Sequence, residues 1–159
     1  MKYLFPVLVV GVFSAFSCRN DSVTTIPGSS LTVRHGTSFG MCRGYCLSEM
    51  TIDGLTATFQ RSTWLEDPLL PVRETTATVS SDEHDAIVGS IDFVQLSRMD
   101  TVIGCPDCAD GGSEWIEVTD NGYHKKVTFE FGKSVPYIQQ LIDGLRASEE
   151  RFRTFARNP

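Results

Sequence analysis

Five cysteines are the residues of this 159-residue chain with the widest choice of chemistry. Four of them form two close pairs, Cys42 with Cys46 and Cys105 with Cys108, and the fifth, Cys18, stands apart near the N-terminus. Thiols paired at such spacings can form structural disulfides, bind a metal ion as thiolates or exchange disulfides. The cellular compartment decides among these chemistries, and the residues before Cys18 bear on the compartment.

The N-terminal segment has the composition of an export signal. Lys2 is the only charged residue before Arg19, and an apolar run occupies residues 3–16. A run of about 14 residues is shorter than the roughly 20 that a membrane-spanning helix needs. We therefore predict a signal peptide over residues 1–17 and an exported protein.

The end of the apolar run indicates attachment of a lipid to Cys18. Ala15-Phe16-Ser17-Cys18 resembles a lipobox, in which a small residue precedes a cysteine whose thiol is diacylated before the signal peptide is cut. Ordinary secretion is the alternative, because Ala15 and Ser17 also satisfy the small-x-small rule for a general signal peptidase. Lipidation of Cys18 is favoured because it leaves an even number of cysteines to pair.

The mature chain has the length of one domain. We predict a lipidated N-terminus and polar tether over residues 18–30, and a single folded domain over residues 31–159. The formal charge is −6, and it becomes −7 when Lys2 is removed. Such acidity disfavours nucleic acid and anionic lipid as partners. The predicted membrane link is therefore the lipid on Cys18, with the domain periplasmic or facing the cell surface.

In an exported protein the two cysteine pairs are expected to form two disulfides, because that environment oxidises thiols. Four cysteines allow three connectivities. One alternative is a zinc or copper site that uses all four thiolates, namely Cys42, Cys46, Cys105 and Cys108. The other is thiol redox chemistry in the segment from Cys105 to Cys108. Redox chemistry is disfavoured because the neighbouring Asp107 opposes a thiolate, and the residues that follow make a poor helix start.

Turn signals separate the alternating segments of the predicted sheet. Asp53-Gly54 and Asn121-Gly122 each lie between two alternating segments, which predicts two tight β-hairpins. Further strands are expected over residues 31–35 and 74–79. Strands joined by hairpins indicate an antiparallel sheet.

Two helices complete the predicted fold. Ser80 and Glu83 have the spacing of a capping box, which predicts a helix that begins there and continues through the apolar residues up to Leu96. A second helix is expected over residues 135–157, with Pro136 in its first turn. We therefore predict an α+β fold of two layers, with an antiparallel sheet of about five to six strands and two helices on one face.

One segment of the sequence resembles a known family. Cys42-Arg43-Gly44-Tyr45-Cys46, followed by a short strand and the turn glycine Gly54, resembles the C-x-G-x-C segment of small exported bacterial proteins that are known only as a domain of unknown function. The similarity covers roughly residues 31–145. It differs at Leu47, where a proline often follows, and in the second pair, Cys105 and Cys108. The resemblance implies an exported α+β domain whose cysteine pairs each close locally, and it implies no activity.

The sequence contains no convincing catalytic set. It lacks a glycine-rich phosphate loop, a G-x-S-x-G elbow and an H-E-x-x-H motif. Trp64 and Trp115 are candidates for a ligand surface, but the favoured interpretation is that they pack against the core. We predict a non-catalytic binding or accessory domain of the cell envelope whose partner is an envelope protein or a small ligand. The alternative is a cysteine-based metal-binding or thiol-redox protein.

Overall fold

The computed structural model describes residues 31–157, so the predicted signal peptide, Cys18 and the tether lie outside the described residues. Within them the chain forms seven strands, three α-helices and one short 3-10 helix. In chain order these are β1 (Thr32–Ser38), β2 (Leu47–Asp53), β3 (Thr56–Ser62), β4 (Arg73–Thr78), α1 (Ser81–Gly89), α2 (Phe93–Arg98), β5 (Val102–Ile103), η1 (Cys108–Asp110), β6 (Ser113–Asp120), β7 (Tyr123–Glu130) and α3 (Gln139–Arg157).

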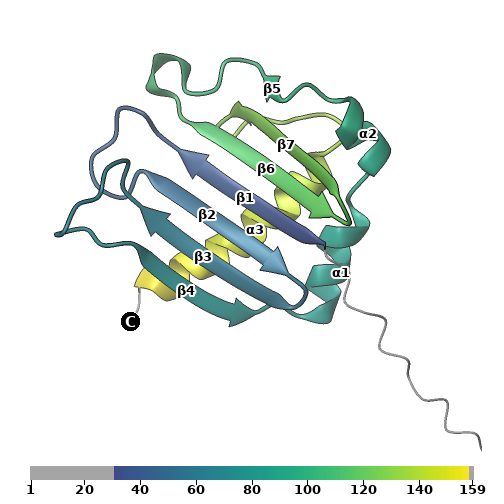
Figure 1. The fold of residues 1–159 in the computed structure, drawn as a ribbon, viewed down its shortest axis with the longest axis horizontal. Coiled ribbons are helices and arrows are strands. Elements are labelled where there is room, and N and C mark those ends of the chain that lie inside the picture. Colours follow the sequence, from purple (N-terminus) through teal and green to yellow (C-terminus); the bar gives the residue numbers. More distant parts are fainter. Residues whose placement is uncertain (1–30, 158–159) are drawn as a thin grey trace, which may run out of the picture.

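The strands form one sheet in the order β4-β3-β2-β1-β6-β7-β5 (Figure 1). Every neighbouring pair is antiparallel except β5 and β7, which are parallel. The predicted α+β class is confirmed, but the predicted count of five to six strands is low by one. The additional strand is β5, which has only two residues and is too short to show an alternating pattern in the sequence.

The two predicted hairpins are present, and one differs in detail. Asn121 and Gly122 both have positive φ, at 43° and 86°, as a type I′ turn requires. At the other hairpin Asp53 pairs with Thr56, so the turn residues are Gly54 and Leu55. The turn therefore lies one position later than the sequence suggested.

The single helix predicted from Ser80 to Leu96 is wrong, because the chain forms two helices there. Ser80 does cap α1, and its Oγ accepts a hydrogen bond from Glu83 N at 3.2 Å. The helix ends when Ser90 turns its hydroxyl back onto Ile87 O, at 2.6 Å. Asp92 then caps α2 by accepting hydrogen bonds from two backbone N–H groups. A second cap inside an apolar pattern is what divides the helix.

The last helix begins later than predicted. It starts at Gln139 and not at 135, because Tyr137 has a φ of 72° in the left-handed region. Pro136 therefore lies in the loop before the helix. Val135 is still fixed to the helix start, since its N–H donates to Gln139 Oε1 at 2.9 Å.

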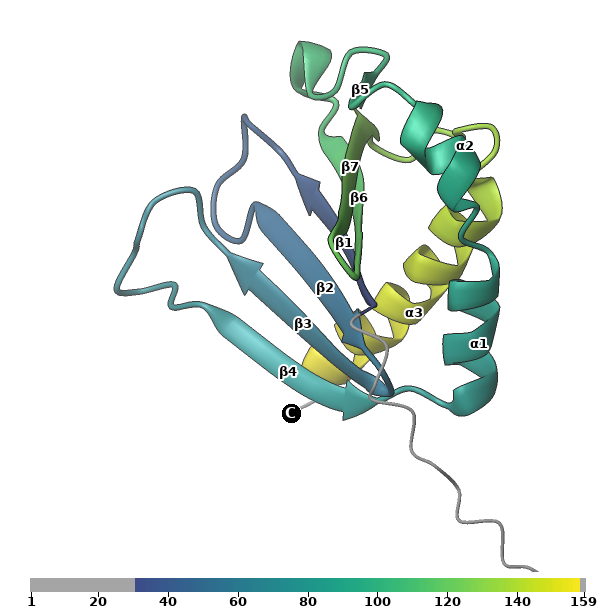
Figure 2. The ribbon, with the colours of Figure 1, turned by 45° about the vertical axis from the view of Figure 1, so that its right-hand side comes forward.

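All three helices cover the same face of the sheet (Figure 2). The core lies between these two layers, where β-strand side chains meet the apolar stripe of α3, and its larger members are Met50, Ile52, Phe59, Ile116, Phe129, Leu141, Ile142, Leu145 and Phe152. The other face of the sheet carries no covering element of the described chain. Among the helices of residues 31–157, none combines the length and apolar composition of a membrane span.

Candidate functional site

The open face of the sheet carries the candidate site, a groove formed by side chains from five neighbouring strands. Strand pairing places these side chains in two rows: Ser62, Leu47, Ser38 and Ser113 in the first, and Gln60, Glu49, Gly36, Trp115 and Thr128 in the second. Together with Trp64 and Lys126 they line a cavity of about 390 Å³. From β3 to β7 the groove crosses four strand spacings, or about 19 Å.

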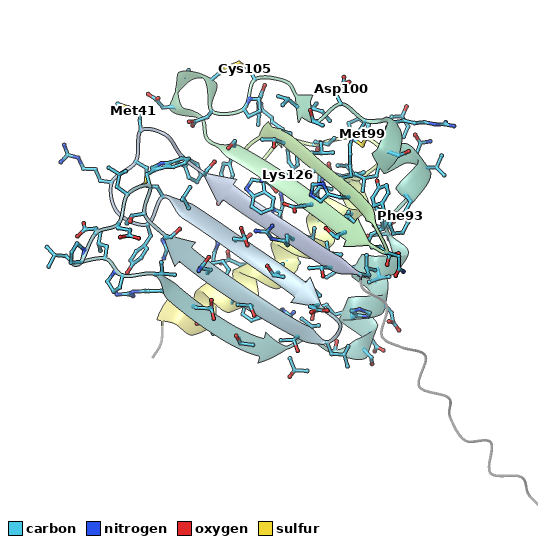
Figure 3. All side chains as sticks on the ribbon, viewed as in Figure 1. Met41, Phe93, Met99, Asp100, Cys105 and Lys126 are labelled. Atoms are coloured by element: carbon cyan, nitrogen blue, oxygen red, sulfur yellow. A yellow bond between two sulfur atoms is a disulfide. The ribbon has the colours of Figure 1, made fainter. Side chains whose placement is uncertain are left out.

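Trp115 is fixed on the floor of this groove by a glycine. A Cβ atom on Gly36 would lie 2.4 Å from Trp115 Cζ2, so the indole sits directly over the backbone of β1 and needs a glycine beneath it. The Lys126 ammonium lies 3.8 Å from the centroid of the Trp115 ring, and the Arg34 guanidinium carbon lies 5.5 Å from it. Both distances are within the range of cation–π attraction. Figure 3 shows Lys126 on this open face.

Trp64 reaches the same groove from the β3–β4 loop. Its Nε1 donates a hydrogen bond to Phe39 O at 2.8 Å, which fixes the indole against the β1–β2 loop. The side chain is nevertheless 52% exposed. The two tryptophans predicted as candidates for a ligand surface therefore line one cavity, although they come from different parts of the chain.

Most charges on the open face are paired across the strands. Arg34 Nη2 lies 2.6 Å from Glu49 Oε1, Arg34 Nη1 lies 3.2 Å from Glu117, and His124 Nε2 lies 3.0 Å from Glu117 Oε1. These contacts form a line from β2 to β7. Lys126 forms no ion pair with any side chain of the described part of the chain. Its ammonium is therefore an available positive charge at the groove.

The four cysteines of the folded domain close two local loops. Cys42 lies at disulfide distance from Cys46, with a Cα–Cα separation of 5.6 Å. Cys105 lies likewise at disulfide distance from Cys108, with a Cα–Cα separation of 5.5 Å. Within residues 31–157, no three His, Cys, Asp or Glu side chains gather as a metal-binding group. The structure thus brings these cysteines together as two pairs.

The two connecting segments that carry the cysteine pairs meet at one end of the sheet, where Figure 3 labels Met41 and Cys105. Asp107 joins them, because its Oδ2 accepts a hydrogen bond from Gly40 N at 3.0 Å and its Oδ1 accepts one from Gly112 N at 3.1 Å. Only the three-residue helix η1 begins at Cys108. A reactive thiolate usually needs the N-terminus of a longer helix, so this arrangement suits a shaped loop better than redox chemistry.

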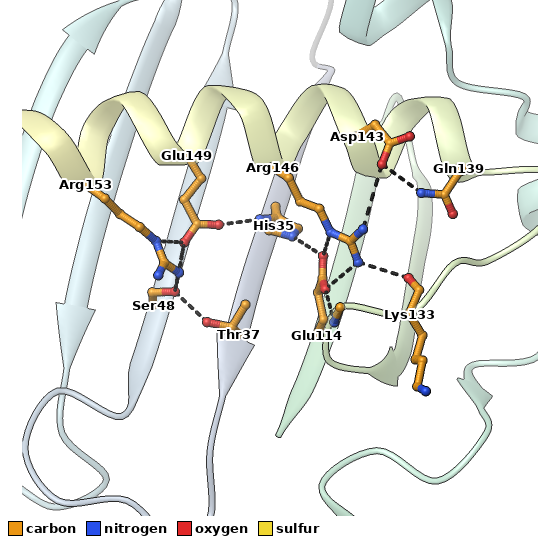
Figure 4. A network of polar contacts seen from close by, with 11 residues as sticks. His35, Thr37, Ser48, Glu114, Lys133, Gln139, Asp143, Arg146, Glu149 and Arg153 are labelled. Atoms are coloured by element: carbon orange, nitrogen blue, oxygen red, sulfur yellow. Dashed lines mark hydrogen bonds and ion pairs between the residues drawn. The ribbon is translucent and has the colours of Figure 1, made fainter. Parts of the chain in front are cut away.

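On the face toward the helices, His35 of β1 lies between two buried carboxylates (Figure 4). Its Nε2 lies 2.8 Å from Glu114 Oε1 of β6, and its Nδ1 lies 2.6 Å from Glu149 Oε2 of α3. Arg146 binds Glu114 through two hydrogen bonds of 2.8 Å. Arg153 binds Glu149 Oε1 through two hydrogen bonds of 3.0 and 2.6 Å. These five residues form what we call the buried charge cluster.

The ionic contacts set the protonation of the cluster. Burial lowers the pKa of His35, but the contacts with Glu114 and Glu149 outweigh burial and raise that pKa above its ordinary value. Burial raises the pKa of Glu114, whereas the hydrogen bonds from His35 and Arg146 lower it more strongly, to about 2. The same balance lowers the pKa of Glu149. The cluster therefore favours an imidazolium between two carboxylates.

The carboxylates of the cluster are already occupied by donors. Glu114 accepts four hydrogen bonds, from His35 Nε2, Gly132 N, and Arg146 Nε and Nη2. Glu149 Oε1 accepts three, from Ser48 Oγ and from Arg153 Nε and Nη2. A cavity of about 290 Å³ borders the cluster, but the two carboxylate side chains are only 1% and 4% exposed. Such groups are poorly placed for acid–base chemistry on a substrate, and they instead fasten α3 to the sheet.

The buried charge cluster was not predicted from the sequence, although the sequence contains a signal for it. His35 follows the buried Val33 by two positions, so both side chains lie on the same face of β1. Glu114 likewise shares a face of β6 with the buried Ile116. Glu149 lies within the apolar stripe of α3. Ionisable residues at core positions of three separate elements are the pattern that predicts such a cluster.

The described chain thus offers an open groove lined by tryptophan and polar side chains, and a buried charge cluster that is already satisfied. These two features come from opposite faces of the sheet, and the groove is the larger of the two cavities, at about 390 Å³ against about 290 Å³. No protein-family model matches the chain, and no curated protein sequence matches it.

Proposed function

We propose that this protein is an exported, lipid-anchored and non-catalytic domain that binds a component of the cell envelope in the groove on its open sheet face. The observation that carries this proposal is the meeting of Trp64 and Trp115 in one cavity of about 390 Å³. The rest of the lining is mainly hydroxyl, amide and charged groups. Aromatic side chains combined with a few polar groups are typical of ligand sites.

The place where the chain enters the domain supports display on an anchor. Leu31 directly precedes β1, and the segments that carry the cysteine pairs lie at the other end of that strand. Figure 1 shows both ends of β1. The rows that form the groove are at the end nearer these segments. A lipid on Cys18 and a tether over residues 18–30 would therefore leave the groove facing away from the anchored end.

The buried charge cluster supports a non-catalytic role. Its carboxylates are the most strongly perturbed acids of the described chain, and such groups are the usual candidates for catalysis. Here hydrogen bonds within the fold occupy them. The resemblance of the C-x-G-x-C segment supports export and adds no activity.

The proposal is tested by co-sedimentation with insoluble bacterial envelope material. The mature chain with Cys18→Ser serves as the soluble parent, and Trp64→Ala and Trp115→Ala are made in it. We expect the parent to sediment and each tryptophan variant to bind at least about tenfold more weakly, as hot-spot aromatics do. Tyr137→Ala is the control, because this exposed aromatic residue lies near α2 and away from the groove.

Thermal unfolding of each variant shows that the fold is retained. The proposal is wrong if the parent does not sediment with the envelope material. It is equally wrong if folded tryptophan variants sediment as well as the parent does.

A further inference from the structure

The length of the groove indicates an elongated ligand. The lining begins at Gln60 and Ser62 of β3 and ends at Lys126 and Thr128 of β7, and these strands are about 19 Å apart. The groove crosses the strands, with Trp64 and Trp115 both along it. A ligand that contacts both indoles and both ends must contain more than one ring.

The polar lining indicates a ligand rich in hydroxyl groups. The Oγ atoms of Ser38 and Ser113 lie 2.5 Å apart and share a hydrogen bond, and Thr128 and Gln60 line the same cavity. Hydroxyl and amide groups both donate and accept hydrogen bonds. Glu49 adds an acceptor. Its Oε1 accepts both hydrogen bonds that Arg34 donates to this residue, and its Oε2 accepts no hydrogen bond from the described residues.

The tryptophans fit the same kind of ligand. A sugar ring has an edge of hydroxyl groups and a face of C–H groups, and that face packs well against an indole ring. An oligosaccharide is elongated, rich in hydroxyl groups and partly apolar, as this groove requires. A peptide in an extended conformation would instead seek an unpaired strand edge, and the groove lies on a face whose strands are already paired.

The charges of the groove add one more requirement. Arg34 is balanced by Glu49 and Glu117, but Lys126 beside Trp115 has no carboxylate partner in the described part of the chain. One unpaired ammonium matches a single negative charge. A carboxylate satisfies it, whereas a phosphate monoester with nearly two charges would face uncompensated repulsion from the glutamates.

We infer that the groove binds an acidic oligosaccharide laid across strands β3 to β7, with a sugar carboxylate on Lys126 and sugar rings against Trp64 and Trp115. This inference rests on the proposed function, and it names the class of envelope component that the groove selects. Carboxylated saccharides of the bacterial envelope include glycan chains with lactyl ether groups and chains of uronic acids. The shared chemistry is a ring with one carboxylate.

Intrinsic fluorescence is a direct reporter of this binding, because the chain has only two tryptophans and both line the groove. The soluble parent with Cys18→Ser is titrated with a tetrasaccharide of alternating N-acetylglucosamine and N-acetylmuramic acid. Chitotetraose is the matched neutral probe, since it lacks only the lactyl ether groups that carry the carboxylates. Trigalacturonate tests the other carboxylated source. We expect a carboxylated probe to bind about tenfold or more tightly than chitotetraose, with an affinity that falls as salt is added.

Variants of Lys126 identify the recognising charge. Lys126→Met should remove the preference for the carboxylated probe over chitotetraose, and Lys126→Arg should keep that preference. Lys133→Met is the matched control, because Lys133 is exposed in the loop between β7 and α3. It should behave like the parent.

The outcomes separate the inference from the proposed function. Tryptophan-dependent sedimentation with envelope material but no saccharide binding overturns the inference and leaves the proposed function in place. Equal affinity for the carboxylated and neutral probes, or a preference that survives in Lys126→Met, also overturns it. If the parent does not sediment, or if its sedimentation does not depend on the tryptophans, both the inference and the proposed function are overturned.

Discussion

His35 and Glu149 join the central strand of the sheet to the long helix, with Nδ1 of the imidazole 2.6 Å from Oε2 of the carboxylate. Their exposed fractions are only 1% and 3%. Charges this deep are costly unless each has a partner, so the stability of the fold depends on the ionisation of both. Stability is therefore expected to fall both when the carboxylates gain protons at low pH and when His35 loses its proton at high pH.

The first prediction is a stability maximum at mildly acidic pH. The pKa of His35 is raised in the folded state, so its stabilising contribution is complete below about pH 6.5 and is lost as the pH rises through the folded-state pKa. The pKa of Glu114 is lowered from 4.5 to about 2, so its contribution is present above about pH 4.5 and is lost as the pH falls toward 2. Thermal unfolding across this pH range should peak between about pH 4.5 and 6.5.

His35→Asn is the variant that assigns the alkaline side of this profile. It removes the group whose proton is lost, so the fall in melting temperature above about pH 6.5 should become shallower. A parent whose melting temperature rises steadily from pH 5 to pH 9 contradicts the assignment. So does a variant with an unchanged alkaline slope.

The second prediction concerns the helix side of the same contact. Glu149→Gln should lower the free energy of unfolding by about 3 kcal/mol, because it leaves the buried His35 and the partly exposed Arg153 beside a neutral amide. The neighbouring Glu150→Gln is the control, since Glu150 is exposed, and it should change that free energy by less than about 1 kcal/mol. Chemical denaturation at about pH 6 measures both. Similar effects of the two changes would show that the cluster does not fasten the helix.

Local signals explain which parts of the fold the sequence could predict. Asn121 and Gly122 both take the positive φ that their types allow, so that hairpin follows from two residues. Tyr137 also has a positive φ, but its type gives no hint of it, and the start of α3 was therefore predicted too early. The parallel pairing of Val102–Ile103 with β7 depends on a distant strand and leaves no local pattern.

The candidate site was less predictable than the fold, because it depends on strand order. Trp115 and Lys126 meet only when β6 pairs with β7, and Trp115 lies over Gly36 only because β6 also pairs with β1. The sequence named Trp64 and Trp115 as aromatic candidates. It contained no information on the register that brings them into one groove.

The third prediction tests the glycine beneath the indole. Gly36→Ala places a Cβ 2.4 Å from Trp115 Cζ2 and 2.8 Å from Ser48 O, so the indole has to leave its place. We expect a loss of about 1–3 kcal/mol in the free energy of unfolding, and a shift of the tryptophan emission toward longer wavelength. Gly89→Ala is the matched control, because nothing lies within 4 Å of its Cβ position. An unchanged emission spectrum in Gly36→Ala would contradict this placement of Trp115.

The fourth prediction concerns the cysteine pairs. With Cys18→Ser, the native chain should have a mass lower by about four hydrogens than the reduced chain and no thiol that reacts under denaturing conditions, because each pair forms a disulfide. Reduction should cost only about 2 kcal/mol for each short loop. Four reactive thiols together with one equivalent of zinc or copper would favour the metal-binding alternative and would exclude the disulfides.

The fifth prediction tests the anchor at Cys18, which lies outside the described residues. The natural chain should partition into the detergent phase and sediment with membranes, because the several acyl chains of a bacterial lipoprotein bind a bilayer stably where one chain does not. Cys18→Ser should move the protein to the aqueous phase and remove the lipid mass. Cys42→Ser is the matched control, since it also removes one thiol but follows the predicted cleavage site by more than twenty positions. It should stay with the membrane, and a Cys18→Ser protein that stays there too, with no change in lipid mass, would show that the chain is held by something other than this thiol.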